Sequence, residues 1–190
     1  MTRPTYRSTI NKVLEPRGFI RTGNDWKREN EAHVDIISVQ STSVLGSTIN
    51  IHAQDKVSER MILDAEPAGP PPTLFPVSVR IQRLVEPNTR DRWWRAGDPN
   101  GPAEAAALIE AYALPFLGRM HTLEGMADYL QKSATKWRDG TSRLHLAVIQ
   151  ARMGDMAQAC ETLRDPPKDY EGRWLGKIVS LRRQFGCGAT

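Results

Sequence analysis

Two segments in the first half of the chain alternate between apolar and polar residues, and this pattern constrains the fold more than any other. They span residues 47–54 and 77–85. Their alternating apolar members are Ile49, Ile51, Ala53, Val77, Val79 and Ile81. Successive side chains of a β-strand point to opposite faces, so each segment predicts a strand with one buried and one solvent-facing side. With two further extended pieces, 19–28 and 33–41, the sequence predicts an antiparallel sheet of about four strands.

From residue 101 onward, apolar residues recur at the three- and four-residue spacing of helices. Gly154-Asp155 is expected to form the elbow of a helical hairpin. The final helix carries four apolar residues on one face: Trp174, Ile178, Leu181 and Phe185. Strands followed by helices is the α+β order, with helices packed on one face of the sheet. We expect an α+β domain over residues 1–140 and a helical C-terminal subdomain, or cap, over residues 141–190.

Composition narrows the environment and the partners. The chain has 190 residues and a formal net charge of +4. No apolar run approaches the roughly 18 residues that a membrane span needs, so we expect no membrane partner. The first residues contain no apolar segment of the kind that marks a secretory signal, and the expected location is the cytoplasm. Cys160 and Cys187 fit a reducing compartment and are expected to be unpaired.

Two adjacent tryptophans, Trp93 and Trp94, lie between Arg92 and Arg95. Neighbours on an extended chain point to opposite faces, so both rings cannot enter one core pocket in the same way. We expect one ring in the core, and the other at the seam between sheet and helices with its indole N–H on a backbone carbonyl. The alternative is a stacking platform for nucleic-acid bases, formed with the two arginines.

Several short motifs together resemble the bacterial domain of unknown function 4304 family, over roughly residues 5 to 132. The motifs are "LEPRGFIRTGNDWKRE", "VQSTS", "RIQRL", "DRWW" and "ALPFL". The resemblance implies the α+β fold class and confers no activity. Here "STSVLGSTINIHA" is shorter and less aromatic than that family would suggest. Near the C-terminus, "LAVIQARMGDMAQACETL" resembles one tetratricopeptide unit, and since such arrays need about three units, we expect a packed cap.

Catalytic and metal-binding signatures are missing from the sequence. The four histidines are scattered without ligand spacing, and no P-loop, GxSxG or dinucleotide fingerprint occurs. We therefore expect no cofactor, and the sequence nominates no catalytic residue, although it leaves open a hydrolase or transferase without a known motif. The remaining candidate for a binding surface is the solvent-facing side of the predicted sheet. If the sheet curves, this side forms a concave polar surface on which a partner could bind.

The favoured hypothesis is a non-catalytic protein-binding module, an adaptor or an immunity-type protein, that contacts another protein through this sheet face. The alternative is a nucleic-acid-binding protein that uses the Arg/Trp segment and the basic C-terminal helix. The candidate binding residues of the two hypotheses are Gln40, Asn50, His52, Arg80, Gln82, Arg92 and Trp94.

Overall fold

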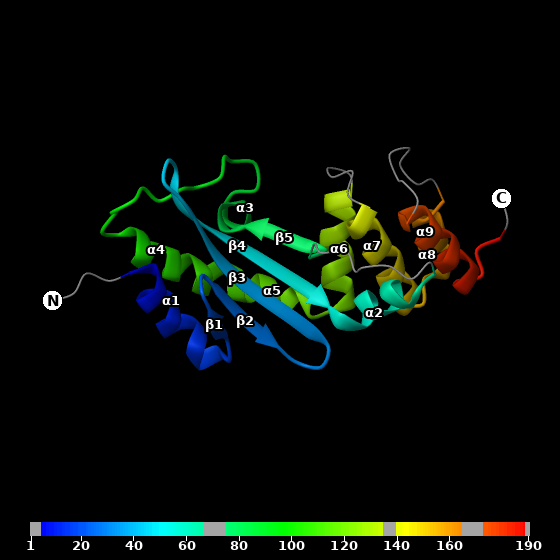
Figure 1. The fold of residues 1–190 in the computed structure, drawn as a ribbon. Helices are drawn as coiled ribbons and strands as arrows, with labels where there is room; N and C mark the ends of the chain where they lie inside the picture. The colour runs from blue at the N-terminus through cyan, green and yellow to red at the C-terminus, as the bar shows by residue number, and fades with distance from the viewer. Residues whose placement is uncertain (1–4, 67–74, 135–139, 165–172, 189–190) are drawn as a thin grey trace. The chain divides into compact units, whose positions relative to one another are not determined.

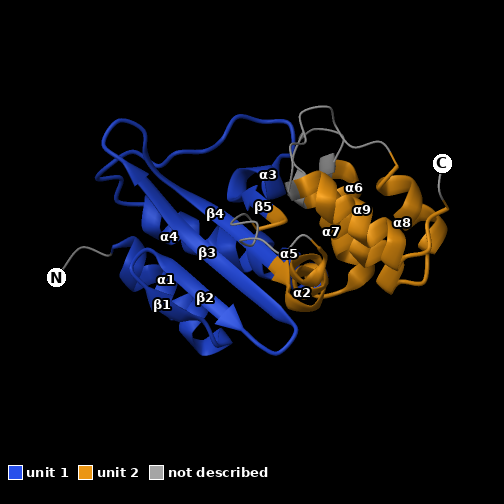
Figure 2. Cartoon of the chain, turned by 45° about the vertical axis from the view of Figure 1, so that its right-hand side comes forward, with its two compact units in different colours: residues 1–53, 78–119 blue, residues 54–77, 120–190 orange. Residues whose placement is uncertain are grey.

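The chain forms two compact units, and each is built from two separate stretches of sequence (Figure 2). The computed structural model describes residues 5–66, 75–134, 140–164 and 173–188. The first unit comprises residues 1–53 and 78–119, and the second comprises residues 54–77 and 120–190. The division expected after residue 140 therefore falls inside the second unit. The reason is that α2, from the first half of the sequence, supplies part of the second unit's core.

A five-stranded antiparallel sheet follows the order of the chain, and the α+β class is confirmed (Figure 1). The strands are β1 (Ile20–Thr22), β2 (Asp25–Glu29), β3 (His33–Thr42), β4 (Gly46–Asp55) and β5 (Val77–Arg80). There is one strand more than expected because residues 19–28 fold into a hairpin instead of a single strand. Gly23 has a φ of 65° as the first residue of its two-residue turn, a position in which glycine is favoured.

Three helices of the first unit lie along one face of this sheet: α1 (Tyr6–Leu14), α4 (Gly101–Leu108) and α5 (Leu114–Met120) (Figure 1). Helix α1 starts at a reciprocal cap between Thr5 and Ser8, and it buries Ile10 and Leu14. The core also takes in Trp26, whose indole N–H donates to the Asn11 Oδ1 of α1 at 2.7 Å. Between α4 and α5 the helix widens into a π-turn, Ile109–Ala113. Pro115 lies two residues after this turn. Its ring cannot be accommodated in the middle of a regular helix without a local rearrangement, which the π-turn provides.

Residues 77–85 do not form the single strand that their alternation predicted. Strand β5 ends at Arg80, and helix α3 (Ile81–Val85) follows directly. The apolar residues Ile81, Leu84 and Val85 have the i, i+3, i+4 spacing of a helix, which takes over where the alternation stops. Ile81 is buried as predicted, but from a helix, and Val79 is only half-buried.

Apart from the adjoining ends of β4 and β5, the second unit is helical in its described part. Its helices are α2 (Lys56–Asp64), α6 (Leu123–Ala134), α7 (Gly140–Arg152), α8 (Met156–Thr162) and α9 (Arg173–Gln184). The elbow of the α7–α8 hairpin is the one predicted: Gly154 has a φ of 87°, and the Asp155 side chain caps α8. A shared core joins α2, α7, α8 and α9 through Ile62, Ala65, Leu144, Ala147, Val148, Leu163, Ile178 and Leu181. Trp174 and Phe185 pack against this core, so the predicted face of the last helix is confirmed.

The second unit also buries one lysine, Lys177 of α9, which is 1% exposed. Its ammonium group donates to the carbonyl oxygens of Ile62, Leu63 and Ala65 at 2.8, 3.3 and 2.9 Å. These carbonyls belong to the C-terminal end of α2, where the helix dipole is negative and carbonyls lack helical partners. Lys177 thus stabilises the end of α2 and attaches α9 to it.

The structure pairs Cys160 with Cys187 in a disulfide, so the expectation of free thiols was wrong. The two residues are 27 positions apart in sequence. Gly186, with a φ of 70°, ends the last helix, and the turn carries Cys187 back to α8, where the two Cα atoms are 5.4 Å apart. No helix in the described parts of the chain is long and apolar enough to cross a membrane.

Replacing Lys177 with methionine should lower the free energy of unfolding by about 2 to 4 kcal/mol, because three carbonyls at a buried helix end lose a charged donor. Methionine keeps most of the side-chain volume, so the loss reports hydrogen bonding. Lys132→Met is the matched control, since that side chain is 75% exposed and pairs with Asp128 on its own helix. Urea unfolding followed by circular dichroism measures both. Equal effects of the two variants would contradict the assigned role of Lys177.

Reducing the disulfide should cost about 3 to 4 kcal/mol of stability, the amount expected for a closed loop of this length. Unfolding in urea with and without dithiothreitol measures the difference. The double variant Cys160→Ser, Cys187→Ser should match the reduced protein and be insensitive to the reductant. If dithiothreitol destabilised the double variant to the same extent, the effect would not come from this bond.

Candidate functional site

Three of the predicted binding residues lie together on the polar face of the sheet. Asn50 and His52 alternate along β4 with Ile49 and Ile51, which are completely buried on the opposite face. The Asn50 side-chain amide donates to Gln40 Oε1 on β3 at 3.2 Å. This part of the alternation prediction is confirmed, and the polar row crosses from β3 to β4.

His52 is half-buried within this row. Burial lowers the pKa of its imidazole, and the nearby negative charge of Asp25 opposes part of that shift. Since the ordinary histidine pKa is about 6.5, His52 is neutral at pH 7. It therefore presents a polar, uncharged imidazole on the sheet face.

The tryptophan segment is attached to β4 by its backbone. Ser47 and Trp94 form an antiparallel bridge, with each main-chain N–H donating to the other's carbonyl at 2.8 Å. A side chain at Gly46 could not be accommodated, because its Cβ would lie 1.9 Å from the Trp94 carbonyl oxygen. The bridge fixes which way the neighbouring side chains point, since paired residues share a face and adjacent residues do not.

One side of this segment faces α4. Trp94 shares the core face with Ser47 and is 2% exposed. Its indole N–H donates to Glu104 Oε2 at 2.9 Å, and the Arg92 guanidinium binds the other oxygen of the same carboxylate at 2.6 Å. Arg92 also lies over the Trp94 ring, 5.7 Å from its centroid. Both predicted binding residues of this segment are therefore engaged with the protein's own helix, and Trp94 offers no ring face to a partner.

The other side of the segment faces β5. The Arg80 guanidinium lies over the Trp93 ring, 5.2 Å from its centroid. Arg80 also forms an ion pair with Asp91, which accepts a second hydrogen bond from Arg83 Nε at 3.2 Å. Trp93 lies opposite Trp94 and so on the side of Asn50. The polar face therefore holds an Arg–Trp stack that Asp91 keeps in place.

The predictions for the two tryptophans are resolved by this arrangement. One ring was expected in the core, and it is Trp94. Trp93 was expected to donate to a backbone carbonyl, but the contact that the structure gives it is the Arg80 guanidinium. Asp91 was missed as a site residue, and Trp93 was expected at a site only as part of the nucleic-acid stacking platform. Applying the same period of two to residues 91–94 would have separated Asp91 and Trp93 from Arg92 and Trp94.

Gln82 does not belong to the polar row, and its assignment there was wrong. It lies in α3 and is 9% exposed, with its amide nitrogen 3.5 Å from both Glu86 and Thr89 side-chain oxygens. The change from strand to helix after Arg80 rotates residue 82 away from the face that alternation predicted.

Tyr6 of α1 closes the core beside Trp94, with ring centroids 6.1 Å apart. The approach is tight, because a Cβ at Gly101 would lie 2.3 Å from the Tyr6 hydroxyl. That hydroxyl is buried and has no hydrogen-bond partner within the described part of the chain. Burial first, and then the negative charges of Asp98 and Glu104, raise the pKa of Tyr6 to about 12.

The raised pKa predicts a loss of stability in alkali. Below pH 10 the tyrosine is protonated in both the folded and unfolded states, whereas between pH 10 and 12 only the unfolded chain releases the proton. The free energy of unfolding should therefore fall across this window. Tyr6→Phe should remove part of that fall and leave stability at pH 7 unchanged or higher, since the hydroxyl makes no hydrogen bond to the described residues. Urea unfolding at pH 8, 10 and 11 tests this, with Tyr112→Phe as an exposed control. An unchanged pH dependence in Tyr6→Phe would contradict it.

Among the residues that the structure describes, no three histidine, cysteine or acidic side chains are placed to hold a metal ion. No protein-family model matches the chain, and no curated protein or solved structure matches it either. The resemblance to the domain of unknown function 4304 family stays a prediction.

Proposed function

We propose that the chain is a non-catalytic protein-binding module, of the adaptor or immunity type, whose contact surface is the polar face of the sheet. The observation that supports it most is the Arg80–Trp93 stack. Tryptophan and arginine are the residue types most enriched among those that dominate binding energy at protein interfaces. Here the two are held together before any partner arrives, by the ion pair of Arg80 with Asp91. A preformed anchor loses less side-chain entropy on binding.

The surroundings of the stack fit the same proposal. Gln40, Asn50 and neutral His52 supply donors and acceptors on the same face, as expected for the polar rim of an interface. Ile49 and Ile51 beneath them belong to the core, so the strands that carry the surface are rigid.

Nucleic acid is the weaker alternative. Its stacking platform used Trp93, Trp94, Arg92 and Arg95, and of these Trp94 and Arg92 engage Glu104. Two cations of the basic terminal helix are also engaged within the protein, since Lys177 is buried and Arg182 donates to the main-chain carbonyls of Leu163 and Arg164. Four of the cations and rings on which this alternative depends are therefore already engaged, and fewer cations of that surface can neutralise phosphates, the interaction that supplies most non-specific affinity.

The proposed location is the cytoplasm, and the Cys160–Cys187 disulfide bears on it directly. Disulfides are rare in reducing cytosol and persist in oxidising compartments. The cytoplasmic proposal therefore requires that this bond be reduced, or be formed only transiently, in the cell.

The surface is tested by affinity purification from the source cells, followed by titration of the purified candidate partner in a calorimeter. Trp93→Ala should raise the dissociation constant by about 30-fold, which is the equivalent of about 2 kcal/mol and is typical of a dominant interface residue. The double variant Arg80→Glu, His52→Glu should abolish binding. The melting temperature of each variant is measured alongside, to separate lost binding from lost folding.

Arg119→Glu provides the matched control, because Arg119 also lies over an aromatic ring, Phe116, but on helix α5. It should change the affinity by less than about twofold. A partner that bound all of these variants equally would remove the sheet face from the proposal. A complex lost on treatment with nuclease, together with a gel shift at tens of millimolar salt, would favour nucleic acid.

A further inference from the structure

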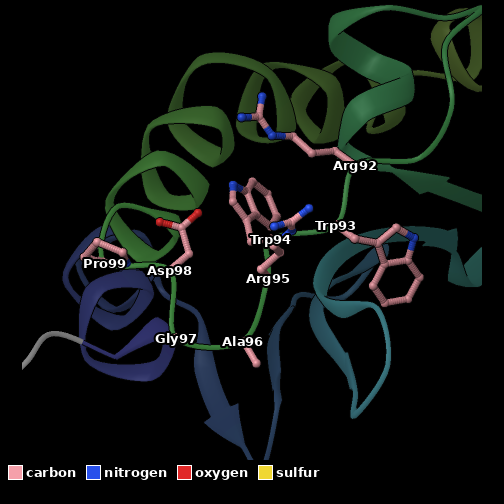
Figure 3. Close-up of a pocket in the computed structure, with 8 residues that line it drawn as sticks. All are labelled: Arg92, Trp93, Trp94, Arg95, Ala96, Gly97, Asp98 and Pro99. Atoms are coloured by element: carbon pink, nitrogen blue, oxygen red, sulfur yellow. The ribbon is translucent and has the colours of Figure 1, made fainter.

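A shallow pocket lies beyond the tryptophan segment, where the chain turns toward α4 (Figure 3). The turn is closed by the Asp98 N–H, which donates to the Arg95 carbonyl at 3.1 Å, and Gly97 has a φ of 83° at its third position. This is the geometry of a type II turn, which favours glycine there. The pocket has a volume of about 500 Å³ and is wide open to solvent.

Two opposite charges line this pocket without pairing with each other. Arg95 makes no ion pair with any carboxylate in the described part of the chain, and Asp98 makes none with any cation there. The Asp98 carboxylate accepts the main-chain N–H of Asn100, at 2.9 Å. The charged residues near Arg95 and Asp98 do form ion pairs: Arg92 pairs with Glu104, and Arg80 pairs with Asp91. The turn thus carries the unmatched charges of a segment whose other charges are matched.

Trp94 is among the residues that line the pocket, but its indole ring is almost completely buried. In Figure 3 the Asp98 carboxylate and the Arg95 guanidinium appear on opposite sides of this ring. The ring cannot move to fill the space, because its backbone is bridged to Ser47 and its N–H is bound to Glu104. Ala96 and Pro99 add small apolar surface to the lining. Arg95 and Asp98 are the first and fourth residues of the turn, so their Cα atoms lie within about 7 Å of each other, beside this small apolar surface.

We propose that this pocket binds a zwitterionic α-amino acid with an apolar side chain. The ligand carboxylate binds the Arg95 guanidinium, whose planar fork matches a carboxylate. The ligand ammonium binds Asp98, and the ligand side chain packs on Ala96 and Pro99. A simple anion would be attracted by Arg95 but repelled by the negative charge of Asp98. A simple cation would be attracted by Asp98 but repelled by Arg95. Both charges on one small molecule satisfy both groups. The site does not depend on the protein partner proposed above.

Three probes test the inference on the full-length protein: L-leucine, N-acetyl-L-leucine, which lacks the ammonium, and L-leucinamide, which lacks the carboxylate. The measurement is the movement of backbone and indole N–H signals in two-dimensional NMR spectra during titration. L-leucine should shift the signals of Arg95, Asp98 and the Trp94 indole saturably, with a dissociation constant on the order of 1 mM. Each blocked probe should bind at least about tenfold more weakly.

Variants identify the groups responsible. Arg95→Gln and Asp98→Asn should each weaken L-leucine binding by at least about tenfold, and the amide oxygen that Asp98→Asn introduces would still accept the Asn100 N–H. Arg90→Gln is the matched control, an exposed arginine five positions before Arg95, and should leave binding unchanged. Signal dispersion in each spectrum confirms that the variant is folded.

Any of three results would overturn the inference. The first is no saturable shift with L-leucine up to about 20 mM. The second is N-acetyl-L-leucine binding as tightly as L-leucine, which would show an anion site only. The third is unchanged L-leucine binding by folded Arg95→Gln. None of these results bears on the sheet face, which is tested separately through Trp93.

Discussion

Two main-chain hydrogen bonds between Ser47 and Trp94 organise the candidate site in the first unit. They attach an irregular segment to the sheet as if it were one more residue pair of a strand. The attachment depends on Gly46, since any larger residue would collide with the Trp94 carbonyl. With the backbone fixed, strand geometry decides the rest: Trp94 enters the core, and Trp93 lies on the polar face. The pairing of Ser47 with Trp94 thus places one tryptophan in the core and leaves the other on the polar face, where the proposed contact surface lies.

The charges around this segment follow the same division. On the side of α4, the Glu104 carboxylate forms an ion pair with Arg92 and accepts a hydrogen bond from the Trp94 indole. On the side of β5, the Asp91 carboxylate forms ion pairs with Arg80 and Arg83. Each ion pair is partly exposed and contributes little stability by itself. Their effect is positional, because they hold aromatic rings whose orientation the backbone has already chosen. Arg95 and Asp98, just beyond the bridge, are the charges that this arrangement leaves unmatched.

Periodicity predicted most of the fold and part of the site. The alternation in β4 identified Ile49 and Ile51 as core and Asn50 and His52 as polar face, since one strand face is buried. It failed at Gln82, because a run that alternates up to Arg80 continues with helical spacing. It could not choose between Trp93 and Trp94, because that choice depends on the bridge to Ser47, a contact between residues far apart in sequence. The disulfide was missed for the same reason, because the turn at Gly186 returns Cys187 to α8 only when α8 and α9 pack on their shared core.

The interleaved units have a consequence for the order in which the molecule is made. Helix α2 leaves the ribosome well before the helices that bury it, because Leu144 follows Ile62 by roughly eighty residues. The first unit has its whole sequence once residue 119 has been synthesised. The second must wait for α9, which brings Lys177 to the end of α2. During translation, the apolar face of α2 is therefore exposed while the sheet beside it in sequence can already fold.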